Sequence, residues 1–147
     1  MMSWVYCVNP KATMARKKNM STENDAFSES WRIQEEVSAL GFDWPSIDGV
    51  FAKVREELGE IELAWTSGEH EHARRELGDL LFATVNLARF LKTDPRAELH
   101  RTNQRFMRRF SLLKELLQHE GRIVEECSLE ELDAVWDRAK KILAREA

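Results

Sequence analysis

Cysteines and long hydrophobic runs are both scarce in this chain, and each absence limits what the protein can be. Its 147 residues include only two cysteines, Cys7 and Cys127. They lie far apart and show none of the close spacings of zinc ligands, so we expect free thiols in a reducing compartment. No apolar run reaches the length of a membrane span, and the N-terminus lacks the charged-then-apolar order of a secretory signal. These features predict a cytoplasmic protein without membrane contact.

The strict alternation of apolar and polar residues that marks β-strands is absent as well. Apolar residues recur instead at helical spacing, which predicts an all-α fold of about five helices, over 23–40, 47–66, 71–91, 95–118 and 128–145. Gly41 is a helix stop, Asp94 followed by Pro95 is a helix start, and Ser128 with Glu131 forms a capping box. One domain is expected over residues 23–147, after a flexible basic leader over residues 1–22.

Charge is distributed unevenly along the chain, whose net charge is −4. Residues 55–79 hold eight acidic residues against three basic ones, whereas residues 89–109 hold seven basic residues against two acidic ones. An acidic strip beside a basic strip suits a metal-bound polyanion better than a nucleic-acid duplex, which calls for one dominant basic face. We therefore expect no nucleic-acid duplex as a partner.

One acidic pattern occurs twice, as Glu57-Leu-Gly-Glu60 and Glu76-Leu-Gly-Asp79, on two consecutive helices separated by a short polar break. Residues three apart are neighbours on a helix surface, so each pair presents two carboxylates to one side. If the two helices fold back antiparallel, four carboxylates meet in one place. Four mutually repelling anions are hard to explain without a cation between them.

The alternative is that both acidic pairs are solvated, as most pairs on surface helices are. Two observations favour a metal site: the pairs share one sequence frame, and both border an apolar stripe rather than the exposed side. On the second helix that stripe is Phe51, Val54, Leu58, Ile61 and Trp65, with Glu57 and Glu60 on its shoulder. Carboxylate oxygens suit Mg²⁺, with Mn²⁺ as a substitute, and not zinc. From the residues alone both interpretations stay open.

The third helix has an apolar arc too broad for a single buried face, which indicates burial by the bundle and by a second subunit. Asn86, two turns beyond Asp79, continues the acidic edge of this helix.

Further along the chain, Arg105 and Arg109 lie one turn apart and can form a fork for phosphate oxygens, unless both are merely solvated. Asn103 falls within an apolar stripe and needs hydrogen-bond partners, either from the core or from a ligand. Trp136 is a core residue by default, and Lys140 can extend from the same face to solvent.

Four sequence blocks together resemble the MazG family of nucleoside triphosphate pyrophosphohydrolases, most closely the C-terminal domain of the bacterial enzyme. They are Gly-Phe-Asp-Trp-Pro at 41–45, Lys-Val-Arg-Glu-Glu-Leu-Gly-Glu at 53–60, Glu-Leu-Gly-Asp-Leu-Leu-Phe-Ala-Thr-Val-Asn-Leu-Ala-Arg at 76–89 and Asn-Gln-Arg-Phe-Met-Arg-Arg-Phe at 103–110. The resemblance implies a MazG-like all-α bundle completed by a homodimer, with a homotetramer as the alternative. Residue by residue, it implies catalysis and Mg²⁺ binding by Glu57, Glu60, Glu76 and Asp79, and substrate contacts from Asn103, Arg105, Arg109, Trp136 and Lys140.

Two departures from the family pattern are visible. The bacterial enzyme has two such domains and this chain has one, and Arg105 stands where relatives often carry lysine, so that a planar fork replaces a point charge.

The expected activity is hydrolysis of nucleoside triphosphates between the α- and β-phosphates, which gives the monophosphate and pyrophosphate. One alternative is a dedicated dUTP/dCTP or phosphoribosyl-ATP pyrophosphohydrolase. The other is a non-catalytic helical binding or regulatory module with the same fold.

Overall fold

A computed structural model describes residues 25–145, and it confirms the all-α prediction: these residues form five α-helices and one short 3₁₀ turn, with no strand. The helix boundaries lie close to those predicted, and the predicted leader over residues 1–22 lies outside the described residues. None of the described helices is long and apolar enough to cross a membrane. The elements are α1 (Ala26–Ala39), α2 (Ile47–Thr66), α3 (His70–Phe90), α4 (Pro95–His119), η1 (Val124–Glu126) and α5 (Leu129–Arg145).

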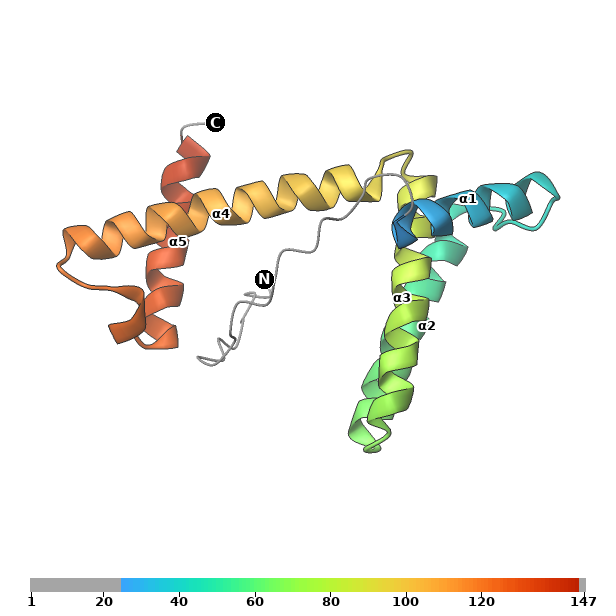
Figure 1. Ribbon diagram of the computed structural model, residues 1–147, viewed down its shortest axis with the longest axis horizontal. Coiled ribbons are helices and arrows are strands. Elements are labelled where there is room, and N and C mark those ends of the chain that lie inside the picture. The colour runs from blue at the N-terminus through green and yellow to red at the C-terminus, as the bar shows by residue number, and fades with distance from the viewer. Residues whose placement is uncertain (1–24, 146–147) are drawn as a thin grey trace.

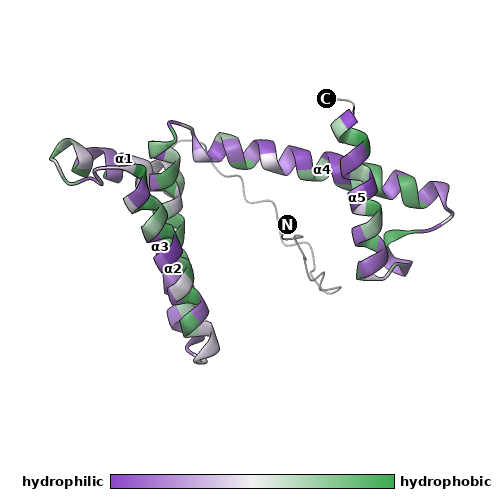
Figure 2. Ribbon diagram, turned by 180° about the vertical axis from the view of Figure 1, so that it is seen from behind, coloured by the Kyte–Doolittle hydropathy of each residue, from purple (hydrophilic) through white to green (hydrophobic). Residues whose placement is uncertain are grey.

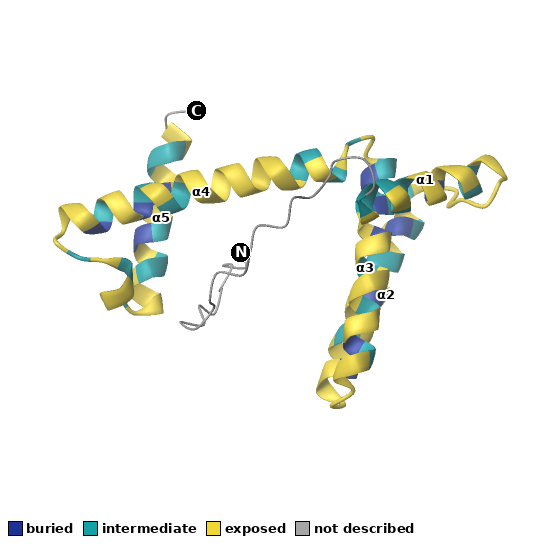
Figure 3. Ribbon diagram, viewed as in Figure 1, coloured by how far each residue is buried: buried dark blue, intermediate teal, exposed yellow. Residues whose placement is uncertain are grey.

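The helices form two packed units joined by α4 (Figure 1). In the first unit, α2 and α3 make an antiparallel hairpin and α1 packs against α3. From the top of this hairpin α4 extends away as one long helix, and α5 crosses its far end. Residues 99–108 of α4, between the two units, are exposed throughout (Figure 3). The single chain therefore leaves much of the surface of this stretch open to solvent.

Each unit has its own small core. In the second unit, Leu113 and Leu117 of α4 pack against Val135 of α5. In the first unit the buried apolar residues are mostly small: Val50, Ala64, Ala73, Ala83, Val85 and Ala88. Alanines at a helix–helix seam allow the two backbones to approach closely, so the hairpin is held by close packing of small side chains.

The apolar stripe expected on α2 is only partly buried: Val54 and Ile61 are half-buried, but its other three members are exposed. The exposed fractions of Phe51, Leu58 and Trp65 are 37%, 48% and 63%. The buried positions of α2 are Val50, Glu57 and Ala64, because the small residue at 64 lets α3 approach that side. Large apolar residues are consequently exposed on the hairpin, and Leu77, Leu81 and Phe82 of α3 are exposed as well. Hydrophobic and hydrophilic residues alternate along both of its helices (Figure 2).

The predicted helix signals act as expected. Asp94 caps α4 by accepting a hydrogen bond from the backbone N–H of Arg96 at 2.9 Å, with Pro95 at the first helical position. In the capping box of α5, the Ser128 backbone N–H donates to Glu131 at 2.7 Å and the Glu131 backbone N–H donates to Ser128 Oγ at 3.3 Å. Gly41 follows α1 with a φ of 90°, a left-handed conformation that favours glycine.

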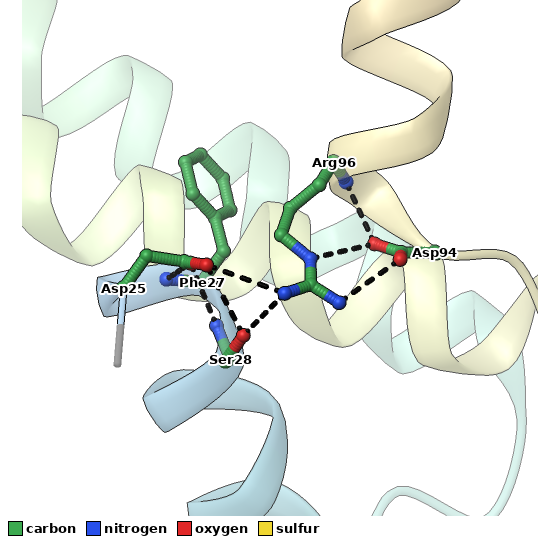
Figure 4. Close-up of polar contacts among 5 residues, drawn as sticks. All are labelled: Asp25, Phe27, Ser28, Asp94 and Arg96. Atoms are coloured by element: carbon green, nitrogen blue, oxygen red, sulfur yellow. Dashed lines mark hydrogen bonds and ion pairs between the residues drawn. The ribbon is translucent and has the colours of Figure 1, made fainter. Parts of the chain in front are cut away.

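Arg96 connects the start of α1 to the start of α4 (Figure 4). Its Nη1 donates to Ser28 Oγ at 2.6 Å and to Asp25 Oδ2 at 3.2 Å, while Nε and Nη2 donate to Asp94 at 3.1 and 3.0 Å. Asp25 is itself the N-cap of α1. One guanidinium thus joins two helix caps far apart in the sequence and sets the direction in which α4 leaves the hairpin.

The segment 40–46, which follows α1, is fastened to α3 by a two-pronged ion pair. Arg89 Nη1 donates to Asp43 Oδ2 at 2.9 Å, and Arg89 Nη2 donates to Asp43 Oδ1 at 2.5 Å. Ser38 Oγ donates to Asp43 Oδ2 at 2.6 Å. The hydrogen bonds from Arg89 and then from Ser38 lower the pKa of Asp43 to about 2.

We expect Asp43→Asn to lower the free energy of unfolding by about 1–2 kcal/mol at pH 7, because it removes the ion pair with Arg89. The loss is limited to this size because the side chains of Asp43 and Arg89 are both partly exposed to solvent. A depressed carboxyl pKa stabilises the folded state above the unfolded value of 3.8, and this stabilisation is lost as the pH falls toward 2. The difference between wild type and variant should therefore shrink below pH 4. Urea denaturation followed by circular dichroism between pH 7 and pH 3 measures it. Asp133→Asn in α5 is the control, and a difference independent of pH would contradict the prediction.

Candidate functional site

The turn between α2 and α3 brings the two acidic pairs together. It is short, because α2 ends at Thr66 and α3 begins at His70, and Gly68 adopts a φ of 78° within it. The two helices therefore run antiparallel in direct contact. Carboxylate oxygens of Glu57, Glu76 and Asp79 lie within 4.8 Å of one another. Three of the four acids of the repeated pattern, which come from two different helices, thus lie close together.

Glu57 is the buried member of this cluster, with an exposed fraction of only 3%. Sequence periodicity placed it on the shoulder of α2, whereas it lies in the seam with α3. A buried carboxylate needs a compensating charge, and Lys53, one turn earlier, forms an ion pair with it. Lys53 Nζ also lies 2.9 Å from Glu56 Oε1. The hydrogen bonds to Glu57 and then to Glu56 raise the pKa of Lys53 above its usual value.

Glu60 lies at the exposed margin of the cluster. Its carboxyl group lies beside that of Glu76, and a hydrogen bond between two carboxyl groups requires a proton on one of them. That hydrogen bond, together with the negative charges of Glu76 and Glu57, raises the pKa of Glu60 above its usual value. The cluster therefore carries more negative charge than its own residues neutralise, and either a proton or a cation relieves it.

His72 supports the cluster from α3. Its Nε2 lies 2.7 Å from Glu76 Oε1, and its Nδ1 lies 3.5 Å from Glu69 Oε2. Sequence reasoning assigned no site role to His72 or to Lys53. The signal that finds both is the spacing of four residues, Lys53 to Glu57 and His72 to Glu76, which makes side chains neighbours on a helix.

The composition of the cluster fits a bound metal ion. Its potential ligands are carboxylate oxygens that belong to two rigid helices, and one of them is buried beside a single lysine. Hard divalent cations prefer oxygen ligands of this kind. Glu57, Glu76 and Asp79 can therefore hold a metal ion, with Glu60 next to them through its hydrogen bond to Glu76.

The predicted substrate residues lie elsewhere. The hairpin and α5 occupy opposite ends of α4, so one chain does not bring the acids and the α5 residues together (Figure 1). Asn103 and Arg105 lie on the exposed stretch of α4, and Arg105 donates to Thr102 Oγ1 at 2.8 Å. The structure places the others as follows: Arg109 is half-buried, the Trp136 ring packs on Phe106 with centroids 5.1 Å apart, and exposed Lys140 lies 2.8 Å from Asp137.

Asn103 is exposed, and so are its neighbours Leu99 and Phe106 on the same apolar stripe, whereas Leu113 and Leu117 further along α4 are buried. The substrate roles of Asn103, Arg105, Arg109, Trp136 and Lys140 stay predictions.

Comparison with known proteins identifies curated relatives, although no protein-family model matches the chain. A Thermotoga maritima protein named nucleoside triphosphate pyrophosphohydrolase/pyrophosphatase MazG is 44% identical over 115 residues, which are 78% of this chain and 44% of the relative. An Escherichia coli K12 nucleoside triphosphate pyrophosphohydrolase is 35% identical over 118 residues, 79% of this chain and 45% of the relative. The uncharacterized protein YabN of Bacillus subtilis is 47% identical over 73 residues, 49% of this chain and 15% of the relative.

The predicted resemblance to the MazG family is thus confirmed. The chain spans less than half the length of the relatives that it matches.

Proposed function

We propose, from the chain's kinship with MazG nucleoside triphosphate pyrophosphohydrolases, that it hydrolyses ribo- and deoxyribonucleoside triphosphates between the α- and β-phosphates. The products are the nucleoside monophosphate and pyrophosphate. The observation that carries this proposal is the convergence of Glu57, Glu76 and Asp79, whose oxygens lie within 4.8 Å, on two antiparallel helices. A cytoplasmic location and the absence of nucleic-acid duplex binding stay predictions.

Mg²⁺ is the metal that we propose for the acidic cluster, with Mn²⁺ as a substitute. Bound there, the ion supplies charge neutralisation for the phosphate oxygens and acidifies water. Glu57, Glu76 and Asp79 provide the oxygen ligands, and Lys53 is the cation that balances Glu57. Glu60 is the exposed carboxyl beside them, and its raised pKa suits a group that accepts a proton from the attacking water.

A second copy of the chain completes the site in this proposal. Three observations support a homodimer: large apolar side chains are exposed on the hairpin, residues 99–105 of α4 are exposed, and the acids lie far from α5 along the single chain. The α4 helix of one copy can reach the hairpin of the other. Arg105 and Arg109 then stabilise negative charge that develops on the departing pyrophosphate. Asn103, Trp136 and Lys140 contact the same substrate. A homotetramer, as a pair of such dimers, is the alternative assembly.

The direct test is a panel of NTPs and dNTPs incubated with the purified protein and Mg²⁺, with products separated by ion-exchange chromatography. We expect monophosphate and pyrophosphate in equal amounts, and no product after EDTA treatment until Mg²⁺ is restored. Nucleoside diphosphate with orthophosphate would refute the cleavage position. Turnover of dUTP and dCTP alone, or of phosphoribosyl-ATP alone, would identify a dedicated enzyme. No product from any nucleotide, with no Mg²⁺-dependent rise in Tm, would indicate a binding module.

A further inference from the structure

The joint between the first unit and α4 is sparsely packed. Only residues 91–94 connect the end of α3 to the start of α4, and the extensive helix contacts of the described chain are α2 with α3, α1 with α3 and α4 with α5. A cavity of about 580 Å³ lies where α1, the end of α3 and the start of α4 meet. Because close packing does not fix the angle at which α4 leaves the hairpin, polar contacts across the joint have to fix it.

Arg96 donates the hydrogen bonds that link α4 to the start of α1 in the described chain. Its Nη1 reaches Ser28 Oγ at 2.6 Å and Asp25 Oδ2 at 3.2 Å (Figure 4). Its Nε and Nη2 hold the two carboxylate oxygens of Asp94 at 3.1 and 3.0 Å. A planar guanidinium with partners on both sides is restricted to one orientation, so these bonds fix a direction as well as a distance.

The acceptors of these bonds are themselves tied to backbone atoms. Asp25 Oδ1 accepts from the backbone N–H groups of Phe27 and Ser28 at 2.9 and 3.0 Å, and Asp94 Oδ1 accepts from the backbone N–H of Arg96 at 2.9 Å. The hydrogen bond from Arg96 is the main cause that lowers the pKa of Asp94, so this pair stays charged at neutral pH. Arg96 therefore couples the first turns of two helices, and not two mobile side chains.

A small rotation at the joint becomes a large displacement further along α4. Arg105 and Arg109 lie ten and fourteen residues after Pro95, which is about 15 and 21 Å along the axis of a straight helix. A rotation of about 10° at Pro95 moves these two positions sideways by roughly 2.5–4 Å over that length. A misplacement of about 1 Å at a reacting group can cost roughly 100-fold in rate, so the angle at the joint matters for any chemistry that uses these arginines.

We infer, resting on the proposed function, that Arg96 is a positioning residue of the two-copy site. It holds α4 at one angle to the hairpin, and it thereby fixes where Arg105 and Arg109 meet a triphosphate bound at the acidic cluster of the second copy. Arg96 acts through α4 and contacts no phosphate itself.

The kinetic test is Arg96→Met, which removes the hydrogen bonds and keeps a good helix former of similar length. For the triphosphate that wild type hydrolyses fastest, we expect KM to rise about 10-fold, whereas partial unfolding would lower kcat and leave KM unchanged. The Mg²⁺-dependent rise in Tm should stay as in wild type, because the acids lie on the hairpin. Arg101→Met is the matched control: its exposed ion pair with Glu98 lies within α4, so KM should not change.

The angle itself is measured by double electron–electron resonance between two nitroxide labels. One label is attached to Ser67→Cys in the hairpin turn and the other to Ser111→Cys on α4, both at exposed positions, with Cys7→Ser and Cys127→Ser in the background. Labelled chains are refolded with an excess of unlabelled chains, so that each measured pair lies within one copy. We expect one narrow distance distribution in wild type and a distribution at least about twice as wide in Arg96→Met.

Arg101→Met should keep the narrow distribution. Ser28→Ala removes one acceptor of Arg96 and leaves the cap of α1 by Asp25 in place, so it should broaden the distribution less and raise KM less. This milder variant carries the test if Arg96→Met does not fold.

An unchanged width after loss of the Arg96 contacts, or a broadened distribution with the KM of wild type, would overturn the positioning role. Failure of the proposed function has a different signature, because wild type would then hydrolyse no triphosphate. In that case a broadened distribution would retain Arg96 as the residue that fixes α4 and would refute only the activity assigned to the site.

Discussion

Glu76→Gln is expected to lower kcat by about 10²–10³-fold and to raise the Tm of the metal-free protein. The loss of activity follows because glutamine brings no negative charge to the metal site. The gain in stability follows from the same change. Without metal, the negative charge of Glu76 is repelled by the neighbouring carboxylates of Glu57, Glu60 and Asp79, and glutamine removes this repulsion. A glutamine amide can donate to Glu60 in place of the shared proton. We expect the gain to be about 0.5–1 kcal/mol, as is common where an active site is relieved of repulsion.

The measurements are steady-state kinetics with Mg²⁺ and thermal denaturation with EDTA or with Mg²⁺. Wild type should gain Tm on addition of Mg²⁺, and Glu76→Gln should gain little. Glu62→Gln is the matched control, since Glu62 is an exposed acid on α2 and not a member of the cluster. It should retain both activity and the Mg²⁺ effect. If Glu76→Gln kept wild-type kcat, or if it destabilised the metal-free protein, the acidic cluster would not be the metal site proposed here.

A mixture of two inactive variants is expected to regain activity if each site uses residues from two copies. Glu76→Gln disables the acidic cluster, and Arg109→Ala removes the predicted phosphate contact on α4. In a mixed dimer, one site combines the intact acids of one copy with the intact arginine of the other, and the second site carries both defects. Random mixing makes half of the dimers mixed, so activity should return to about a quarter of the wild-type value.

The negative control for this mixture is Glu76→Gln with Asp79→Asn. Both changes affect acids of the same hairpin, so neither site of their mixed dimer is intact and no activity should return. Co-expression with two different affinity tags yields the mixed dimer, and its mass confirms the composition. A mixed dimer of Glu76→Gln and Arg109→Ala that stays inactive would show that the arginine and the acids act within one copy. A chain that sediments as a monomer at assay concentration would remove the two-copy site altogether.

The local elements follow closely from the sequence because short-range signals specify them. The boundaries of α2 match the prediction, and the caps at Asp94 and Ser128 act through hydrogen bonds within a few residues. The acidic cluster was predictable for a related reason. The turn around Gly68 is so short that the two helices it joins must run antiparallel, and this arrangement brings the two acidic pairs side by side.

Other features depend on side-chain size across an interface, which periodicity does not report. The apolar residues of α2 define a stripe, but the seam with α3 forms one position away, where Ala64 permits close approach. That shift buries Glu57 and exposes Leu58. The same limit applies to Gln34, which is polar in sequence and buried in the structure. Its unpaired oxygen is apparent only once Phe82 occupies the neighbouring position on α3.

By itself, the sequence determined that this protein is all-helical, where its helices begin and end, and that two acidic pairs meet on neighbouring helices. These properties depend on helical period, caps and one short turn, all of which act over a few residues. Only the tertiary structure decided which carboxylate is buried, that Lys53 balances it, and that the α5 residues lie at the other end of α4 from the acids. The reason is physical: burial and convergence depend on how closely distant segments pack, and that depends on the volumes of all the side chains between them.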